Sequence, residues 1–312
     1  MGLLVVGSVA LDSVKTPFGE ADEVLGGSAT YFSISASYFT DVNLVAVVGN
    51  DFPEEHINLL KSHSVNVDGL EQKLGKTFRW KGKYDFDLNE AHTLDTRLNV
   101  FADFNPEIPD SYKDCKYVFL ANIDPDLQIK VLDQIKNPKL IVCDTMNYWI
   151  EGKLDSLKEL LSRIHILIIN EGETRELGKD PNVVKAAQKI LSWGPECLIV
   201  KRGEYGSLMF SNSSIFSAPA YPLEFVYDPT GAGDTFAGGF MGYIAKADSV
   251  SDETRRQAIV FGSTMASFNV EKFSLDRLQS LSWDEIEDRF RFFKRITHFE
   301  DLNLSGAGTT IR

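Results

Sequence analysis

The sequence contains few cysteines and no long hydrophobic run. Its three cysteines, Cys115, Cys143 and Cys197, are far apart and form no Cys-x-x-Cys pair. This pattern argues against a disulfide framework or a zinc site and predicts a reduced, cytoplasmic protein whose thiols pack in the core. No apolar run is long enough for a membrane span. The first residues, MGLLVVGSVALD, lack the basic flank and the length of a signal peptide, so we interpret them as a first strand.

Positive charge is also scarce. Asp and Glu number 45 against 32 Lys and Arg, which gives a formal net charge of -13. Nucleic acids and anionic membranes are bound by basic surfaces, so neither is an expected partner. A small anionic ligand is still compatible with this charge, because backbone amides, a lysine and Mg²⁺ can oppose it locally.

The chain is long and apolar enough to bury a large core. It has 312 residues, of which 43% are hydrophobic. Apolar runs typical of strands buried on both faces of a parallel sheet recur along it: GLLVVGSV, NLVAVVG, YVFLAN, LIVCD, ILIIN and CLIVKRG. Amphipathic segments that we expect to be helical lie between them, at 28–39, 53–63, 126–136, 153–163, 171–178 and 182–193. We therefore predict one α/β domain over residues 1–312, with a central, mostly parallel sheet flanked by helices.

Residues 77–102 break this alternation. They mix aromatic, charged and β-branched residues in the manner of half-exposed antiparallel strands. We predict that they form a small sheet over the main one, joined by residues 12–24, and that this sheet acts as a lid on a site that closes. The tail LSGAGTTIR lacks an apolar helix after its Gly-Ala-Gly triplet, so we expect a frayed terminus there.

The stretch DPTGAGDTF, residues 228–236, carries the main chemical signal. The amides of Gly231, Ala232 and Gly233 precede an apolar helical run, and free amides at a helix start favour phosphate or an oxyanion. Asp234 falls in the first turn, where it is either a helix cap or the base that takes a proton from an attacking hydroxyl. The Walker and dinucleotide-binding patterns do not fit, because Asp234 and Phe236 occupy positions that those motifs reserve for other residues.

These residues resemble the signature Asp-Thr-x-Gly-Ala-Gly-Asp of the ribokinase-like (PfkB) sugar and nucleoside kinases, here beginning at Asp228 with Pro229 as its one departure. Further elements follow the order of that family along nearly the whole chain. They are Asp12 in VVGSVALD, the pair Gly26-Gly27, Asn170 and Glu173 in IINEGE, and Lys201, Gly203 and Gly206 in VKRGEYG.

The resemblance implies a ribokinase-like fold and ATP-dependent phosphorylation of a hydroxyl on a small sugar or nucleoside. It implies that Asp234 is the base, with Gly231, Ala232 and Gly233 as the anion hole. Asp12, Gly26 and Gly27 are implied to contact the acceptor. The nucleotide is implied to bind at Thr230 and at the IINEGE and VKRGEYG elements, and Glu173 to act on Mg²⁺ through water.

Each element also has a purely structural interpretation. Asp12 can end a strand, Gly26-Gly27 can be a tight turn with positive φ, and Asn170 with Glu173 can be a helix cap and its partner. A ligand-binding protein without catalysis on the same fold is a further alternative, against which the presence of Asp234 argues. A vitamin or hydroxymethylpyrimidine kinase is disfavoured by Asp12 and Gly26-Gly27.

The acceptor is the open question. Tyr31 stands where ribose kinases of the family often carry Asn, and Lys201 stands where Thr often opens the nucleotide turn. The segment around NVEKFSL lacks the glycines that help to hold a monovalent cation in ribokinases. Arg79 and Trp80 belong to an aromatic-rich part of the expected lid, where rings can stack on a base. A nucleoside is therefore slightly favoured over a ribose- or fructose-type sugar, while pairing of two lids in a homodimer is an alternative use of the same aromatic residues.

Overall fold

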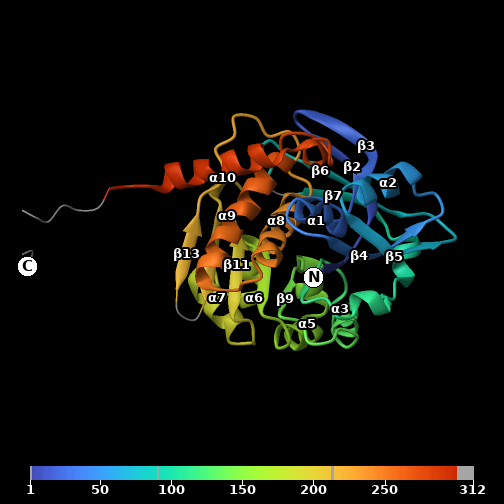
Figure 1. Cartoon of the computed structure of the whole chain (residues 1–312), viewed down its shortest axis with the longest axis horizontal. Coiled ribbons are helices and arrows are strands. Elements are labelled where there is room, and N and C mark those ends of the chain that lie inside the picture. The colour runs from blue at the N-terminus through green and yellow to red at the C-terminus, as the bar shows by residue number, and fades with distance from the viewer. Residues whose placement is uncertain (1, 90, 212–213, 301–312) are drawn as a thin grey trace, which may run out of the picture.

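The computed structural model describes residues 2–89, 91–211 and 214–300, so the tail from residue 304 onward lies outside the described residues. Within them, a nine-stranded sheet has the order β13-β12-β11-β10-β9-β8-β1-β4-β5 (Figure 1). Its strands are β1 (Leu3–Val6), β4 (Val42–Gly49), β5 (Val65–Lys73), β8 (Tyr117–Leu120), β9 (Leu140–Cys143), β10 (Ile166–Asn170), β11 (Cys197–Lys201), β12 (Ser207–Ser211) and β13 (Ile215–Ala218). In this sheet β12 runs antiparallel to both β11 and β13, and the other neighbouring strands are parallel. The mostly parallel sheet predicted from the apolar runs is confirmed, while β5, β12 and β13 were not among those runs.

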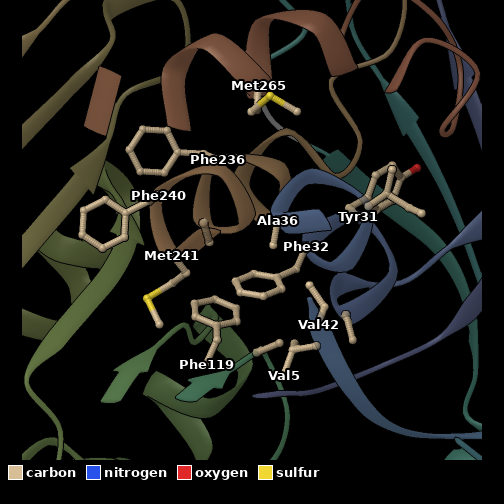
Figure 2. Packing of buried hydrophobic residues seen from close by; sticks show 14 of the residues in the cluster. Val5, Tyr31, Phe32, Ala36, Val42, Phe119, Phe236, Phe240, Met241 and Met265 are labelled. Atoms are coloured by element: carbon tan, nitrogen blue, oxygen red, sulfur yellow. The ribbon is translucent and has the colours of Figure 1, made fainter. Parts of the chain in front are cut away.

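Helices cover both faces of this sheet, as the alternation of side chains along each strand requires. Leu3 and Val5 of β1 belong to one core, which also contains residues of α1 (Ser28–Ser37), α2 (Glu54–Ser62), α8 (Ala232–Ala247), α9 (Asp252–Asn269) and α10 (Trp283–Thr297). Leu4 and Val6 belong to the opposite core, with residues of α3 (Pro125–Leu132), α4 (Asn147–Gly152), α5 (Leu154–Leu161), α6 (Glu171–Gly178) and α7 (Val183–Leu191). The first core is close-packed, and in Figure 2 the ring of Phe32 lies on that of Phe119, at 4.3 Å between centroids.

A second sheet of four strands has the order β3-β2-β6-β7, which confirms the predicted small sheet. It consists of β2 (Ala10–Thr16), β3 (Gly19–Gly26), β6 (Phe78–Tyr84) and β7 (Ala91–Arg97). Two hairpins supply its antiparallel pairs, and β2 runs parallel to β6. The short helix at Asn99–Asp103 ends the predicted segment and is not part of the sheet.

One expectation about the first strand is wrong. The run GLLVVGSV was expected to be a single strand, but β1 ends at Val6 and the chain enters the small sheet at Ala10. At Gly7 a β-carbon would stand 2.6 Å from the β-carbon of Ala121, so the chain leaves the main sheet where only glycine fits. The break places Asp12 on the small sheet rather than at the end of a core strand. No helix within the described residues is long and apolar enough to cross a membrane.

Candidate active site

The predicted motifs meet at one edge of the main sheet, where the carboxyl ends of its parallel strands lie. Asn170 ends β10, Lys201 ends β11, and Asp144 follows β9 directly. In open α/β sheets, ligands bind outside the carboxyl ends of the strands. The start of α8 and the small sheet are brought to the same edge, so segments from distant parts of the sequence share one site.

The loop that leads into α8 has the geometry of an anion site. The helix begins at Ala232, with Gly231 as its N-cap residue in the left-handed region at φ 73°. Glycine has no side chain to occupy the amides of the first turn, of which that of Ala232 donates to the carbonyl oxygen of Pro229 at 3.1 Å. Asp234 is the third residue of the helix, so it is not the N-cap residue that one interpretation of the sequence required. Before the loop, the carboxylate of Asp228 accepts a hydrogen bond from the amide of Thr230 at 2.9 Å.

Two side chains lie close to the glycines of this loop. A β-carbon on Gly231 would stand 2.4 Å from the ring of Tyr31, in addition to the strain of its positive φ. A β-carbon on Gly233 would stand 2.7 Å from Nζ of Lys201. The tyrosine ring and the lysine ammonium therefore lie against the predicted phosphate-binding amides.

The acceptor side of the predicted site centres on Asp12, which is buried. Its Oδ2 accepts a hydrogen bond from the amide of Gly27 at 3.3 Å, and a β-carbon on Gly26 would stand 1.9 Å from the same oxygen. Gly26 ends β3 and Gly27 is the N-cap residue of α1, so of the structural interpretation only the positive φ is found, at Gly27 with φ 93°. Burial raises the pKa of Asp12 to about 7, against the hydrogen bond from Gly27, and the charges of Asp228 and Asp234 act in the same direction as burial.

Carboxylates also gather around Lys201. Its Nζ lies 3.6 Å from Oδ2 of Asp144. Burial raises the pKa of both Glu173 and Asp234 to about 7, and the charge of Asp144 acts in the same direction. Burial opposes the charge on Lys201, yet Asp144, Glu173 and Asp234 outweigh it and raise the pKa of the ammonium. The site thus combines one buried cation with several carboxylates that are costly to ionise together.

Asn170 and Glu173 form a reciprocal capping box at the start of α6. The amide of Asn170 donates to Oε2 of Glu173 at 2.8 Å, and the amide of Glu173 donates to Oδ1 of Asn170 at 2.8 Å. The structural interpretation of this pair is therefore realised, and it fixes the carboxylate of Glu173 near Lys201. Gly203 and Gly206 form the turn after β11, both with positive φ.

The small sheet contributes Trp80 and Tyr84 to the site. Trp80 lies directly opposite Asp12 in the pairing of β2 with β6, so the two side chains share a face of the sheet. The indole lies over Gly82, where a β-carbon would stand 2.2 Å from it, and its Nε1 donates to Oγ1 of Thr93 at 3.1 Å. The hydroxyl of Tyr84 lies 3.3 Å from Oγ1 of Thr230, next to the anion loop.

Arg79 lies on the other face, because consecutive strand residues point to opposite sides. Its guanidinium pairs with Glu23 at 2.6 Å and with Asp51 at 2.9 Å. These contacts join β6 to β3 and to the loop after β4. They give no support to the predicted contact between Arg79 and the acceptor.

Asp144 is a site residue that the sequence interpretation missed. It is buried, and its Oδ1 accepts a hydrogen bond from the amide of Thr145 at 2.8 Å. Its position could have indicated a site residue: Asp144 directly follows the apolar run LIVC, just as the predicted site residue Asn170 ends a core strand. Within the described ranges, no group of three or more His, Cys, Asp or Glu side chains can hold a metal ion. A divalent cation here would thus depend on water and on a ligand's oxygens, which is how Mg²⁺ is usually held.

Comparison with known proteins decides the family. The pfkB family carbohydrate kinase profile matches residues 19–280. The chain belongs to the PfkB family. A relative, cytidine kinase from Thermococcus kodakarensis, is 32% identical over 246 residues, which are 77% of this chain and 87% of that protein. This PfkB-family kinase is therefore a phosphotransferase with an alcohol group as acceptor, as the signature at 228–234 predicted.

Solved structures agree on the fold of this PfkB-family kinase. Nucleoside kinase from Methanocaldococcus jannaschii has a TM-score of 0.74 at 20% identity and covers 93% of this chain and 98% of that one. An E. coli protein assigned as a ribokinase II, solved with ATP and Mg²⁺, has a TM-score of 0.76 at 18% identity and covers 94% and 99%. The ribokinase-like fold is confirmed.

The raised pKa of Asp12 leads to a prediction about stability and pH. The folded-state pKa lies above that of the unfolded chain, so burying the ionised carboxylate costs most above pH of about 7. We expect ligand-free Asp12→Asn to exceed the wild type in free energy of unfolding by roughly 1 to 3 kcal/mol at about pH 8. This difference in free energy of unfolding between the variant and the wild type should narrow as the pH falls toward about 4. Urea unfolding across this range measures it.

The control is Asp103→Asn, a change at an exposed position. It should leave the pH dependence of the wild type in place. If the difference in free energy of unfolding between Asp12→Asn and the wild type stays constant with pH, burying the ionised carboxylate of Asp12 does not carry the expected cost.

Proposed function

We propose that this kinase phosphorylates the primary hydroxyl of a nucleoside with ATP. One observation carries the proposal: Asp234 stands in the first turn of α8 beside the glycine-rich helix start and Lys201, while Asp12 and Trp80 share a face of the small sheet. The site therefore offers a base, an anion hole, a ligand for hydroxyls and a planar surface. The likeness to a cytidine kinase and to a nucleoside kinase structure supports the choice of acceptor.

Asp12, Gly26, Gly27 and Tyr31 would bind the sugar of the acceptor. The buried carboxylate of Asp12 can accept hydrogen bonds from ring hydroxyls, and the two glycines lack side chains that would keep them from the backbone. The hydroxyl of Tyr31 is buried and has no hydrogen-bond partner. Such an unpaired group is costly until something binds it, so it favours a polar ligand beside Asp12.

Trp80 would hold the base of the nucleoside. Its indole is fixed by Gly82 beneath it and by the hydrogen bond to Thr93, so little side-chain entropy remains to be lost on stacking. A fixed aromatic surface on the face of Asp12 suits a base attached to the sugar that Asp12 binds. A free sugar would leave this surface unused.

The phosphate side of the site would bind ATP. The amides of Gly231, Ala232 and Gly233 would receive the γ-phosphate, with Lys201 and Thr230 beside them. The strand ends and turns at Asn170, Glu173, Gly203 and Gly206 would contact the rest of the nucleotide. Mg²⁺, held through water by Glu173 and Asp144, would neutralise part of the phosphate charge. The E. coli structure with ATP and Mg²⁺ supports both cosubstrate and metal.

The reaction needs positioning and charge neutralisation more than covalent help. The oxygen of the acceptor hydroxyl attacks the γ-phosphorus, and the bond between that phosphorus and the bridging oxygen of ADP breaks. Asp234 takes the proton of the hydroxyl. Lys201 and the loop amides stabilise the transferring group, and Lys201 also offsets the carboxylates that would otherwise repel the phosphates.

Asp234→Asn tests the base. We expect turnover to fall by about 10² to 10⁴, the usual effect of removing a general base, with ATP affinity largely kept. Since Asp234 must be ionised and its pKa is raised to about 7, wild-type kcat/KM should rise with pH and level off above about that value. ADP release in a coupled assay measures both.

Asp284→Asn is the matched control, because Asp284 is an exposed acid in the first turn of another helix. It should keep full turnover. If Asp234→Asn behaves like this control, Asp234 only stabilises its helix.

Trp80→Ala tests the nucleoside assignment against the sugar-kinase alternative. Stacking of one base contributes about 1–3 kcal/mol, so the KM for a preferred nucleoside should rise roughly 5-fold to 150-fold. Phe86→Ala, which removes an exposed ring from the connection between β6 and β7, should change this KM little. Assays use a panel of nucleosides, pentoses and hexoses. A wild type that phosphorylates ribose or fructose and ignores every nucleoside would contradict the acceptor, while the kinase assignment would stand.

We also propose that the small sheet is a lid, since it carries Asp12 and Trp80 and touches the anion loop through Tyr84 and Thr230. Amide hydrogen exchange in β6 should slow when nucleoside binds, because a closed site excludes water. The distant edge strand β13 is the internal control. Unchanged exchange at saturating nucleoside would contradict a lid. Protection that instead rises with protein concentration would assign exposed side chains such as Phe86 and Leu94 to a homodimer contact.

A further inference from the structure

Asn269, the last residue of α9, joins the two ends of the anion loop. It is buried, and its Nδ2 donates to the carbonyl oxygen of Thr230 at 2.7 Å. Its Oδ1 accepts a hydrogen bond from Oγ1 of Thr235 at 3.3 Å. Thr230 precedes Gly231 and Thr235 follows Asp234, so one amide side chain spans the whole segment that would bind the phosphate and supply the base.

The loop depends on such outside support because its own residues provide little. Gly231, Ala232 and Gly233 have no polar side chains, and glycine leaves the backbone free to adopt many conformations. The chain around Asn269 supplies further support just before the loop. The carbonyl of Val270 accepts from the amide of Tyr227 at 2.8 Å, and Oδ2 of Asp228 accepts from the amide of Ser274 at 3.3 Å.

The position of Asn269 is itself fixed by close packing of α9 on α8. A β-carbon on Gly262 of α9 would stand 2.7 Å from the carbonyl oxygen of Phe236 in α8, and one on Gly239 would stand 3.0 Å from the carbonyl oxygen of Phe261. The two helices therefore touch through their backbones. The end of α9 cannot shift along α8 without breaking this contact, so the amide is held in register with the start of α8.

We propose that Asn269 is a positioning residue for phosphoryl transfer, which sets the geometry of the Gly231–Asp234 segment through Thr230 and Thr235. The inference rests on the proposed role of that segment. The site requires a donor and an acceptor on one short side chain. Asparagine provides both, whereas ionised aspartate cannot donate and alanine can do neither. Asn269 touches no reacting atom, so its contribution is made through the loop.

Asn269→Ala tests the proposal in the full-length enzyme. Its kcat, corrected for the folded fraction, should fall about 10-fold to 100-fold, because small displacements of catalytic groups have effects of this size. The KM for nucleoside should stay within about threefold, since Asp12 and Trp80 of the small sheet remain in place. Thr264→Val is the matched control, a buried change in the same helix at a hydroxyl without a hydrogen-bond partner. It should leave both constants near wild type.

Thr235→Val removes the other end of the link while keeping the shape of the side chain, so it serves if Asn269→Ala fails to fold. We expect a smaller loss of kcat than for Asn269→Ala. The double variant should have the same kcat as Asn269→Ala alone, because both changes break the same hydrogen-bonded link. The proposal is overturned if either folded single variant keeps kcat within about threefold of wild type. An inactive wild type would overturn the proposed function instead.

Discussion

The close packing of α8 between α1 and α9 is the constraint on which the site depends. A β-carbon on Gly238 would stand 2.4 Å from the carbonyl oxygen of Phe32 in α1, and one on Gly262 would stand 2.7 Å from that of Phe236 in α8. Glycines on facing surfaces let the three backbones touch, so the start of α8 has a fixed place beside the strand ends. Free amides are useful to a phosphate only if they do not move when it arrives.

The electrostatics of the site follow from that placement. Fixing Asp234 at the start of α8 brings it within the influence of Asp144, which follows β9, and of Lys201, which ends β11. Burial makes ionisation of these carboxylates costly, and Lys201 offsets part of the cost. In the protein without ligand, several buried carboxylates therefore remain close together with one lysine to offset their charge.

Much of the fold could be read from the sequence, because buried parallel strands are continuous apolar runs. YVFL, LIVC and ILII were identified for that reason. Strand β5 has a mixed, half-exposed pattern at the edge of the sheet, which does not differ locally from a loop. The apolar run GLLVVGSV at the start of the chain shows no break in its pattern, although it contains β1 of the main sheet and leads into β2 of the small sheet. At Gly7, where this run leaves the main sheet, the close neighbour is Ala121, more than a hundred residues away.

The sequence by itself determined the family and the chemistry, because the signature at 228–234 places an acid beside three small residues at a helix start whatever surrounds it. The tertiary structure decided which residues share a face and which support the loop. Trp80 and Arg79 are neighbours in sequence, yet they point to opposite faces of the small sheet. Trp80 lies on the face of Asp12, whereas Arg79 pairs with Glu23 and Asp51. Asp144 and Asn269 belong to no motif, and their roles come from contacts with Lys201, Thr230 and Thr235. Such contacts join residues that are distant along the chain, and no local pattern encodes them.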